Sequence, residues 1–222
     1  MDKRSSWMTK SANNKDFERL KRALQVFQSA RLNNTYADLK KDPQYVKIGH
    51  FFFEMLYAPE DFSFRDASIK KLHRLLKGKV YKGMVTAVTQ VIELHELSDM
   101  LDDRMVEQMI ATGVGENMQM DQYQKIYRSL DNYDQRVYQI KLSTKVTRAF
   151  HKLSKKWVVA LSLPTVRSAA HLIGMGKIFD FIYEGYNGFR VIKNIDFFVE
   201  TVEQREMAWH DEIWYGKTQA RT

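Results

Sequence analysis

The sequence contains no cysteine, and only 3 prolines and 10 glycines interrupt its 222 residues. Without cysteine the chain can form no disulfide bond, no thiolate-ligated zinc or iron–sulfur site, and no thiol nucleophile. The scarcity of proline and glycine favours long helices over the many turns of an all-β fold. The longest dense apolar run, residues 157–163, is far shorter than the roughly 20 residues of a membrane-spanning helix. We therefore expect no transmembrane segment.

The N-terminal residues are polar and contain no apolar stretch of the kind that forms a signal peptide. This feature and the absence of cysteine predict a cytoplasmic protein. Hydrophobic residues make up 44% of the chain and charged residues 28%, a composition suited to a folded domain with its own core. We expect a disordered tail over residues 1–13, one helical domain over 14–215 and a C-terminal tail over 216–222.

Apolar residues recur at steps of three and four through most of the chain, beginning with Phe17, Leu20, Leu24 and Phe27. This spacing places them on one face of a helix, whereas a half-buried strand would alternate apolar and polar residues. The pattern predicts an all-α fold, a single-domain bundle of roughly eight to ten helices.

Several residues predict where individual helices begin and end. Thr35 and Asn194 are of the types that cap helix N-termini. Pro164 predicts a break, because proline cannot donate a backbone hydrogen bond inside a helix. Residues 112–117 read as a loop, and a further break is expected around residues 98–102.

A row of basic side chains gives the net charge of +8 a pattern. Its members follow one another at steps of four, three, four and three, so they share one helical face. They are Lys141, Lys145, Arg148, Lys152 and Lys155. Like charges at this spacing repel by a few tenths of a kcal/mol per pair. An anionic partner, either a polyanion or an anionic membrane, would relieve that repulsion; the alternative is a solvated helix face.

A second candidate site consists of acids that follow apolar runs and of arginines that can neutralise them. A charge buried in a core must be paired, so these residues predict a polar cluster that is either structural or ligand-binding. Its members are Glu54, Arg65, Asp66, Glu93, Arg190 and Glu203.

Two His/Glu pairs have the four-residue spacing that metal ligands on one helix face can have. They are His50 with Glu54 and Glu206 with His210. The Glu-x-x-His sequence of di-metal helical bundles is absent from the chain. The pairs are therefore weak metal candidates, and we expect no metal, no other cofactor and no catalytic residue.

The chain resembles a known family in one segment above all. Residues 51–62 read FFFEMLYAPEDF, preceded by TYADL at 35–39 and followed by Arg65-Asp66 and by ELHELS at 93–98. These segments resemble the FFLEELY-motif proteins, a family of uncharacterised bacterial helical proteins. Phe53 and Met55 stand where the family motif has Leu and Glu. The resemblance implies one helical domain over nearly the whole chain and no known reaction.

These features favour a non-enzymatic intracellular helical protein that acts as a binding or adaptor protein for another protein. A homo-oligomer is compatible with the same features. Two alternatives stay open at this point: a helical bundle that binds a small apolar or metal ligand, which would allow an enzyme, and a protein that binds a polyanion or an anionic membrane through the basic row.

Overall fold

The computed structural model describes residues 3–50, 82–172, 174 and 176–216, and every regular element in this part of the chain is an α-helix. The all-α prediction is confirmed. The helices are α1 (Lys3–Thr35), α2 (Ala37–Lys41), α3 (Val46–His50), α5 (Lys82–Thr112), α6 (Met120–Ser129), α7 (Tyr133–Ser154), α8 (Trp157–Leu172), α9 (Gly176–Val191) and α10 (Ile195–Tyr215).

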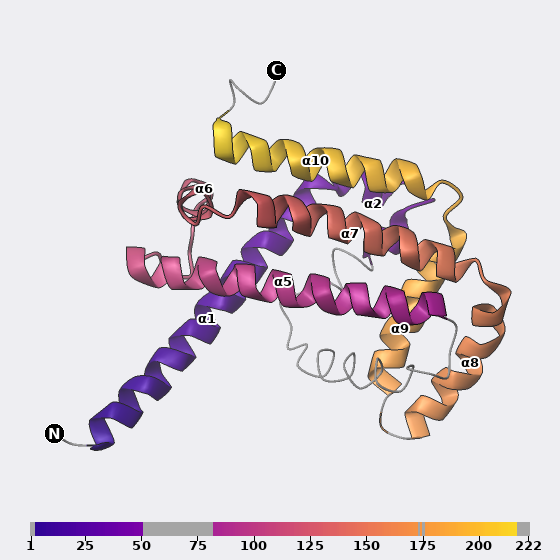
Figure 1. Cartoon of the computed structure of the whole chain (residues 1–222), viewed down its shortest axis with the longest axis horizontal. Helices are drawn as coiled ribbons and strands as arrows, with labels where there is room; N and C mark the ends of the chain where they lie inside the picture. The colour runs from indigo at the N-terminus through magenta and orange to yellow at the C-terminus, as the bar shows by residue number, and fades with distance from the viewer. Residues whose placement is uncertain (1–2, 51–81, 173, 175, 217–222) are drawn as a thin grey trace.

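Three long helices, α5, α7 and α10, run side by side, with α7 in the middle (Figure 1). The chain direction of α7 is opposite to that of its two neighbours, so α5 and α10 are parallel to each other. The helix α1 crosses this layer obliquely and packs against α5, while α8 and α9 pair at the other end of the molecule. One long face of α7 is therefore flanked by a helix on each side.

The buried apolar residues gather in two clusters, and α10 contributes to both. One cluster joins the end of α1 with α2, α3, α9 and the first turns of α10, where Phe198 and Val199 are buried. The other joins the middle of α1 with α5, α6 and the last turns of α10, where Ile213 is buried. The second cluster is rich in methionine and tyrosine, which fill the irregular gaps between helices that cross at an angle.

The helix α1 extends further toward the N-terminus than the sequence predicted. Residues 1–13 were expected to be an irregular tail, but the helix begins at Lys3. Residues such as Lys, Arg, Met and Ala favour helix, and a helix already nucleated elsewhere adds each further residue at little cost.

Three other boundaries differ from the predicted ones. Thr35 ends α1 and donates its hydroxyl to the Arg31 carbonyl oxygen, so it does not cap α2. The helix α5 is continuous through residues 98–102, and α8 is continuous through Pro164. In α8 the buried neighbours Val159 and Leu163 hold the helix together, so packing outweighs the hydrogen bond that proline removes.

Two predicted boundaries are confirmed. Asn194 caps α10, because its side-chain oxygen accepts a hydrogen bond from the Phe197 backbone nitrogen at 3.2 Å. A loop follows α5 as expected, and it begins at Gly113 with a φ of +70°, a conformation that glycine adopts without strain. Among the described helices, none has both the length and the apolar character required to cross a membrane.

Candidate functional site

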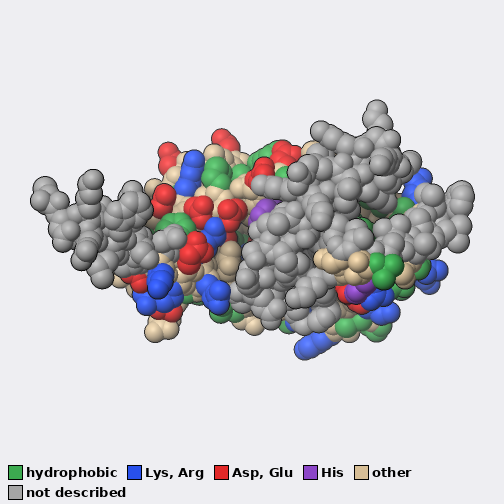
Figure 2. Space-filling model, turned by 90° about the horizontal axis from the view of Figure 1, so that it is seen from below, with side chains coloured by type: hydrophobic (Ala, Val, Ile, Leu, Met, Phe, Trp, Pro, Cys, Tyr) green, Lys and Arg blue, Asp and Glu red, His purple; other side chains and the backbone are tan. Residues whose placement is uncertain are grey.

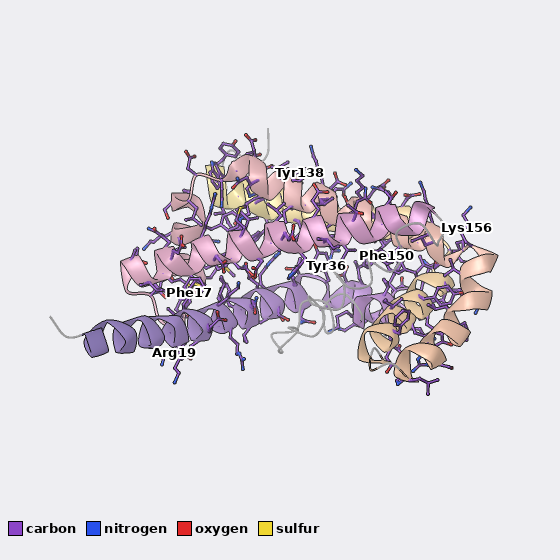
Figure 3. The ribbon with its side chains drawn as sticks, turned by 60° about the horizontal axis from the view of Figure 1, so that its bottom comes forward. Phe17, Arg19, Tyr36, Tyr138, Phe150 and Lys156 are labelled. Atoms are coloured by element: carbon purple, nitrogen blue, oxygen red, sulfur yellow. The ribbon has the colours of Figure 1, made fainter. Side chains whose placement is uncertain are left out.

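A groove with a volume of about 490 Å³ runs along the outer face of α7. Its size is within the range of ligand-binding clefts in general. The groove is lined by one residue of α5, by six residues of α7 and by one of α10: Gln90, Lys141, Thr144, Lys145, Arg148, Ala149, Lys152 and Glu203. In Figure 3, Tyr138 of α7 lies at the opposite side of the molecule from Phe17 and Arg19 of α1. This face of α7 therefore points away from α1.

Four of the five residues of the predicted basic row line this groove. Lys141, Lys145 and Lys152 are exposed, and Arg148 is half-buried. Arg148 forms an ion pair with Asp196 at the start of α10, with 3.1 Å between Nε and Oδ1. Within the part of the chain that the structure describes, the three lysine ammonium groups make no ion pair. The floor of the groove therefore presents three cations that have no partner in the described chain.

Lys155, the fifth residue of the predicted row, has a different place. Its ammonium group donates to the carbonyl oxygens of Arg190 and Ile192, at 2.8 and 2.9 Å. These carbonyls lie at the C-terminal end of α9, where a helix has unpaired acceptors and a partial negative charge. Lys155 thus stabilises the junction between α9 and α10 and does not line the groove.

The helices on both sides of the groove carry acidic residues, of which Glu203 lines the groove itself. On α10, Asp196, Glu200 and Glu203 recur at steps of four and three, so they form a row along the side of that helix. On α5, the exposed Glu93 accepts a short hydrogen bond from the hydroxyl of Tyr138, which is also exposed. That hydrogen bond is the first cause of the raised pKa of Tyr138. The cations of the floor therefore lie between two walls that carry carboxylates.

The structure does not bring the described members of the predicted polar cluster together. Glu93 and Glu203 lie on the two walls, on either side of α7, and Arg190 is exposed in the last turn of α9. Glu54, Arg65 and Asp66 lie outside the described residues. The helical spacing could not indicate which helices would meet.

The described residues of the weak metal candidates have other partners. Both carboxylate oxygens of Glu206 accept hydrogen bonds from Arg31, and His210 Nδ1 is 2.9 Å from the Tyr127 hydroxyl oxygen. The His50 side chain and Glu54 lie outside the described residues. Elsewhere in the described chain, no group of three or more His, Asp or Glu side chains is placed to hold a metal ion.

The pair of Arg31 and Glu206 is the centre of a charged cluster that sequence reasoning missed. Its two hydrogen bonds are both 2.7 Å long, and the two side chains are only 13% and 14% exposed. Tyr36 donates its hydroxyl to Glu206 at 2.7 Å, and the Arg31 guanidinium lies 4.2 Å from the centre of the Trp209 ring. No local signal could have found the pair, because its members lie near opposite ends of the chain.

The electrostatics of this charged cluster follow from its burial. Burial by itself lowers the pKa of Arg31, but the charge and hydrogen bonds of Glu206 outweigh it and leave the pKa raised. Burial, followed by the charge of Glu206, raises the pKa of Tyr36 far above its usual value. Arg31 therefore stays charged and Tyr36 neutral at any physiological pH, which suits a fixed structural element.

A second buried group lies nearby, around His210. This side chain is fully buried, and its ring packs 4.4 Å from the ring of Tyr133 and 5.7 Å from that of Tyr127. Arg136 is also buried, and its guanidinium carbon lies 4.6 Å from the centre of the Tyr127 ring. Burial lowers the pKa of His210, and the positive charge of Arg136 lowers it further, against an opposing effect of Asp211. His210 is therefore held in its neutral form.

The sequence of the chain matches one known protein family. A family model described as "Domain of unknown function (DUF8198)" matches residues 8–220. The chain belongs to this family. The match extends over most of the chain, in keeping with the expectation of an uncharacterised family that spans it. No curated protein and no solved structure matches the chain.

Proposed function

We propose that this DUF8198 protein is a non-enzymatic binding protein that engages an anionic partner through the groove along α7. One observation carries the proposal: Lys141, Lys145 and Lys152 lie in line on the floor of a groove without any ion pair in the described chain. Like-charged side chains at this spacing repel one another, so the row costs the free protein stability that a bound anion would return.

The surroundings of two buried ionisable groups, Glu206 and His210, favour binding over catalysis at those positions. A catalytic acid or base needs a reachable proton and a pKa near the working pH. Glu206 is instead held by Arg31 and Tyr36, and His210 is enclosed by aromatic rings. These groups are engaged in holding helices together, whereas the groove cations face outward.

We also propose a motif family and a cellular location for the protein. We assign the chain to the bacterial FFLEELY-motif proteins on the segment FFFEMLY, residues 51–57, which lies outside the described residues. We also propose that it is cytoplasmic, because a chain without cysteine suits a reducing compartment.

Retention on immobilised heparin tests the proposal. In the groove variant, Lys141, Lys145 and Lys152 are all changed to Gln. A control variant of equal net charge changes three exposed lysines elsewhere, Lys15, Lys41 and Lys47, to Gln. We expect the groove variant to elute at clearly lower salt than the control, because clustered cations release more counterions than scattered ones. Equal elution of the two variants would show that the groove lysines do not bind heparin.

A further inference from the structure

The charges around the groove alternate in rows. The floor row on α7 consists of Lys141, Lys145, Arg148 and Lys152, at steps of four, three and four. The wall row on α10 consists of Asp196, Glu200 and Glu203, and the α5 wall carries Glu93. On the face shown in Figure 2, acidic and basic side chains lie next to one another over part of the described surface.

This arrangement is a poor match for a nucleic acid. The phosphates of a nucleic acid follow a winding backbone. The floor cations instead lie in one straight row along α7, about 5 Å apart, since each step of three or four residues rises 1.5 Å per residue. Phosphates that spread beyond the narrow floor would also meet Glu93 and Glu203 on the walls, and like charges brought together oppose binding.

An acidic α-helix matches the same row. Its own rise is that of α7, so carboxylates at positions i, i+4, i+7 and i+11 cover the same length of about 16 Å as the four floor cations. Such carboxylates lie on one narrow face, and the residues beside that face meet the walls. Cations at those flanking positions would pair with the acid that lines the α10 wall, Glu203.

The shape of the site also suits a helix. Two parallel helices, α5 and α10, lie on either side of α7 (Figure 1), and each contributes one residue to the lining of the groove in which a helix would dock. Thr144 and Ala149 lie on the floor between the long cations. Such small side chains let two helix backbones approach within the 8–10 Å that is typical of packed helices. Insertion of a helix into a groove is a common mode of peptide recognition.

We infer that the groove docks an α-helix of another protein whose carboxylates recur at i, i+4, i+7 and i+11, with basic residues beside them. This inference rests on the proposed function, since it names the partner of the same groove. The floor cations give affinity for the carboxylate row, and the wall acids select against partners whose negative charge is not confined to one face.

Two labelled helical peptides of identical composition test the inference. One carries four Glu at i, i+4, i+7 and i+11 with Lys on both sides, and the other distributes the same residues around the helix. Fluorescence anisotropy with the full chain at low salt should show the patterned peptide binding about tenfold more tightly, since new exposed ion pairs with the three groove lysines add up to about that much. The groove variant K141Q/K145Q/K152Q should lose this preference, while the control variant K15Q/K41Q/K47Q keeps it.

A labelled single-stranded oligonucleotide separates the two proposals. The helix inference would be overturned if both peptides bound equally, or if the oligonucleotide bound more tightly than the patterned peptide. The proposed function would still stand in either case, provided that these affinities depended on the groove lysines. If no probe, heparin included, distinguished the groove variant from the control variant, the proposed function itself would be wrong. Glu203→Gln sharpens the test, because it should narrow the preference for the patterned peptide over the oligonucleotide.

Discussion

The interior near Arg31 and the outer face of α7 use the same kinds of charged side chain to opposite ends. Inside, Arg31 and Glu206 neutralise each other through two hydrogen bonds and are almost removed from water. On α7, Lys141, Lys145 and Lys152 remain exposed without an ion pair in the described chain. The role of a charged side chain therefore depends on its partners and not on its type. The buried pair fixes the fold, and the exposed row is available to a partner.

The consequences for stability differ accordingly. A buried ion pair is not a large net source of stability, because its formation removes two charges from water. Loss of one member is nevertheless costly, because the other charge stays buried without a partner. An exposed cation can be removed with little effect, since water solvates whatever remains.

The largest effect is expected at Glu206. Glu206→Ala leaves the Arg31 guanidinium buried without its carboxylate, and we expect the free energy of unfolding to fall by about 3–5 kcal/mol. Urea unfolding followed by circular dichroism measures the change. Glu203→Ala, one helical turn away on the groove side, is the matched control and should alter stability by less than about 0.5 kcal/mol.

A double variant checks the physical reason. In Arg31→Met/Glu206→Leu both charges are replaced by apolar side chains of similar length, and the protein should be clearly more stable than the Glu206→Ala variant. If the double variant lost as much stability as the sum of its single changes, the charges would not interact, and the contrast between the two regions would fail.

The next effect concerns pH and His210. Burial lowers the pKa of His210 in the folded state below its unfolded value of 6.5, so the unfolded chain binds the proton more readily. The stability that neutral His210 contributes is therefore complete above that pH. It is lost as pH falls below 6.5 and through the folded pKa, with a slope of at most about 1.4 kcal/mol per pH unit.

Urea unfolding between pH 7.5 and 5 measures this dependence in the wild type and in His210→Gln. The titratable groups that face His210 are Tyr127, Tyr133, Arg136 and Asp211, and all four are kept in the variant. The variant should be less stable at pH 7.5 but should lose less stability on acidification. Parallel profiles would mean that His210 accepts a proton in the fold without penalty.

A smaller effect separates Lys155 from the other residues of the predicted row. Lys155 donates to two carbonyl oxygens at the end of α9, so Lys155→Gln should lower stability by about 1 kcal/mol. Heparin retention should fall no further than it does for a single control lysine such as Lys41. If Lys155→Gln instead weakened heparin binding as much as Lys145→Gln, then Lys155 would belong to the binding surface.

How far the sequence predicts this molecule depends on whether a signal is local. The period of three to four residues predicted the helices, and Asn194 predicted the start of α10, because a cap acts within one turn. The break predicted at Pro164 was wrong. The hydrogen bond that proline removes is a local effect, whereas the packing of Val159 and Leu163 that outweighs it depends on other helices. Local rules therefore held wherever tertiary contacts agreed with them.

The same distinction applies to the sites. The basic row lies within one helix, so its spacing alone placed Lys141, Lys145, Arg148 and Lys152 on one face. The walls come from α5 and α10, and nothing in the spacing on α7 identifies Gln90 or Glu203 as their neighbours. The pairing of Arg31 with Glu206 is likewise a contact between distant segments. In the sequence, Glu206 stands out only by its spacing from His210. That spacing indicates that the two residues share one part of α10, but it does not indicate their partners on other helices.

The smallest expected effect has the opposite sign. Lys145 lies one turn from both Lys141 and Arg148, so it takes part in two like-charge pairs on α7. Lys145→Gln should therefore raise the free energy of unfolding by a few tenths of a kcal/mol at low salt. The gain should disappear in about 1 M salt, where exposed charges are screened within about 3 Å. Urea unfolding at both salt concentrations measures it, with Lys41→Gln as the control. A clear loss of stability would show that Lys145 makes a structural contact, as Lys155 does, and the floor of the groove would then resemble the interior more than a surface kept for a partner.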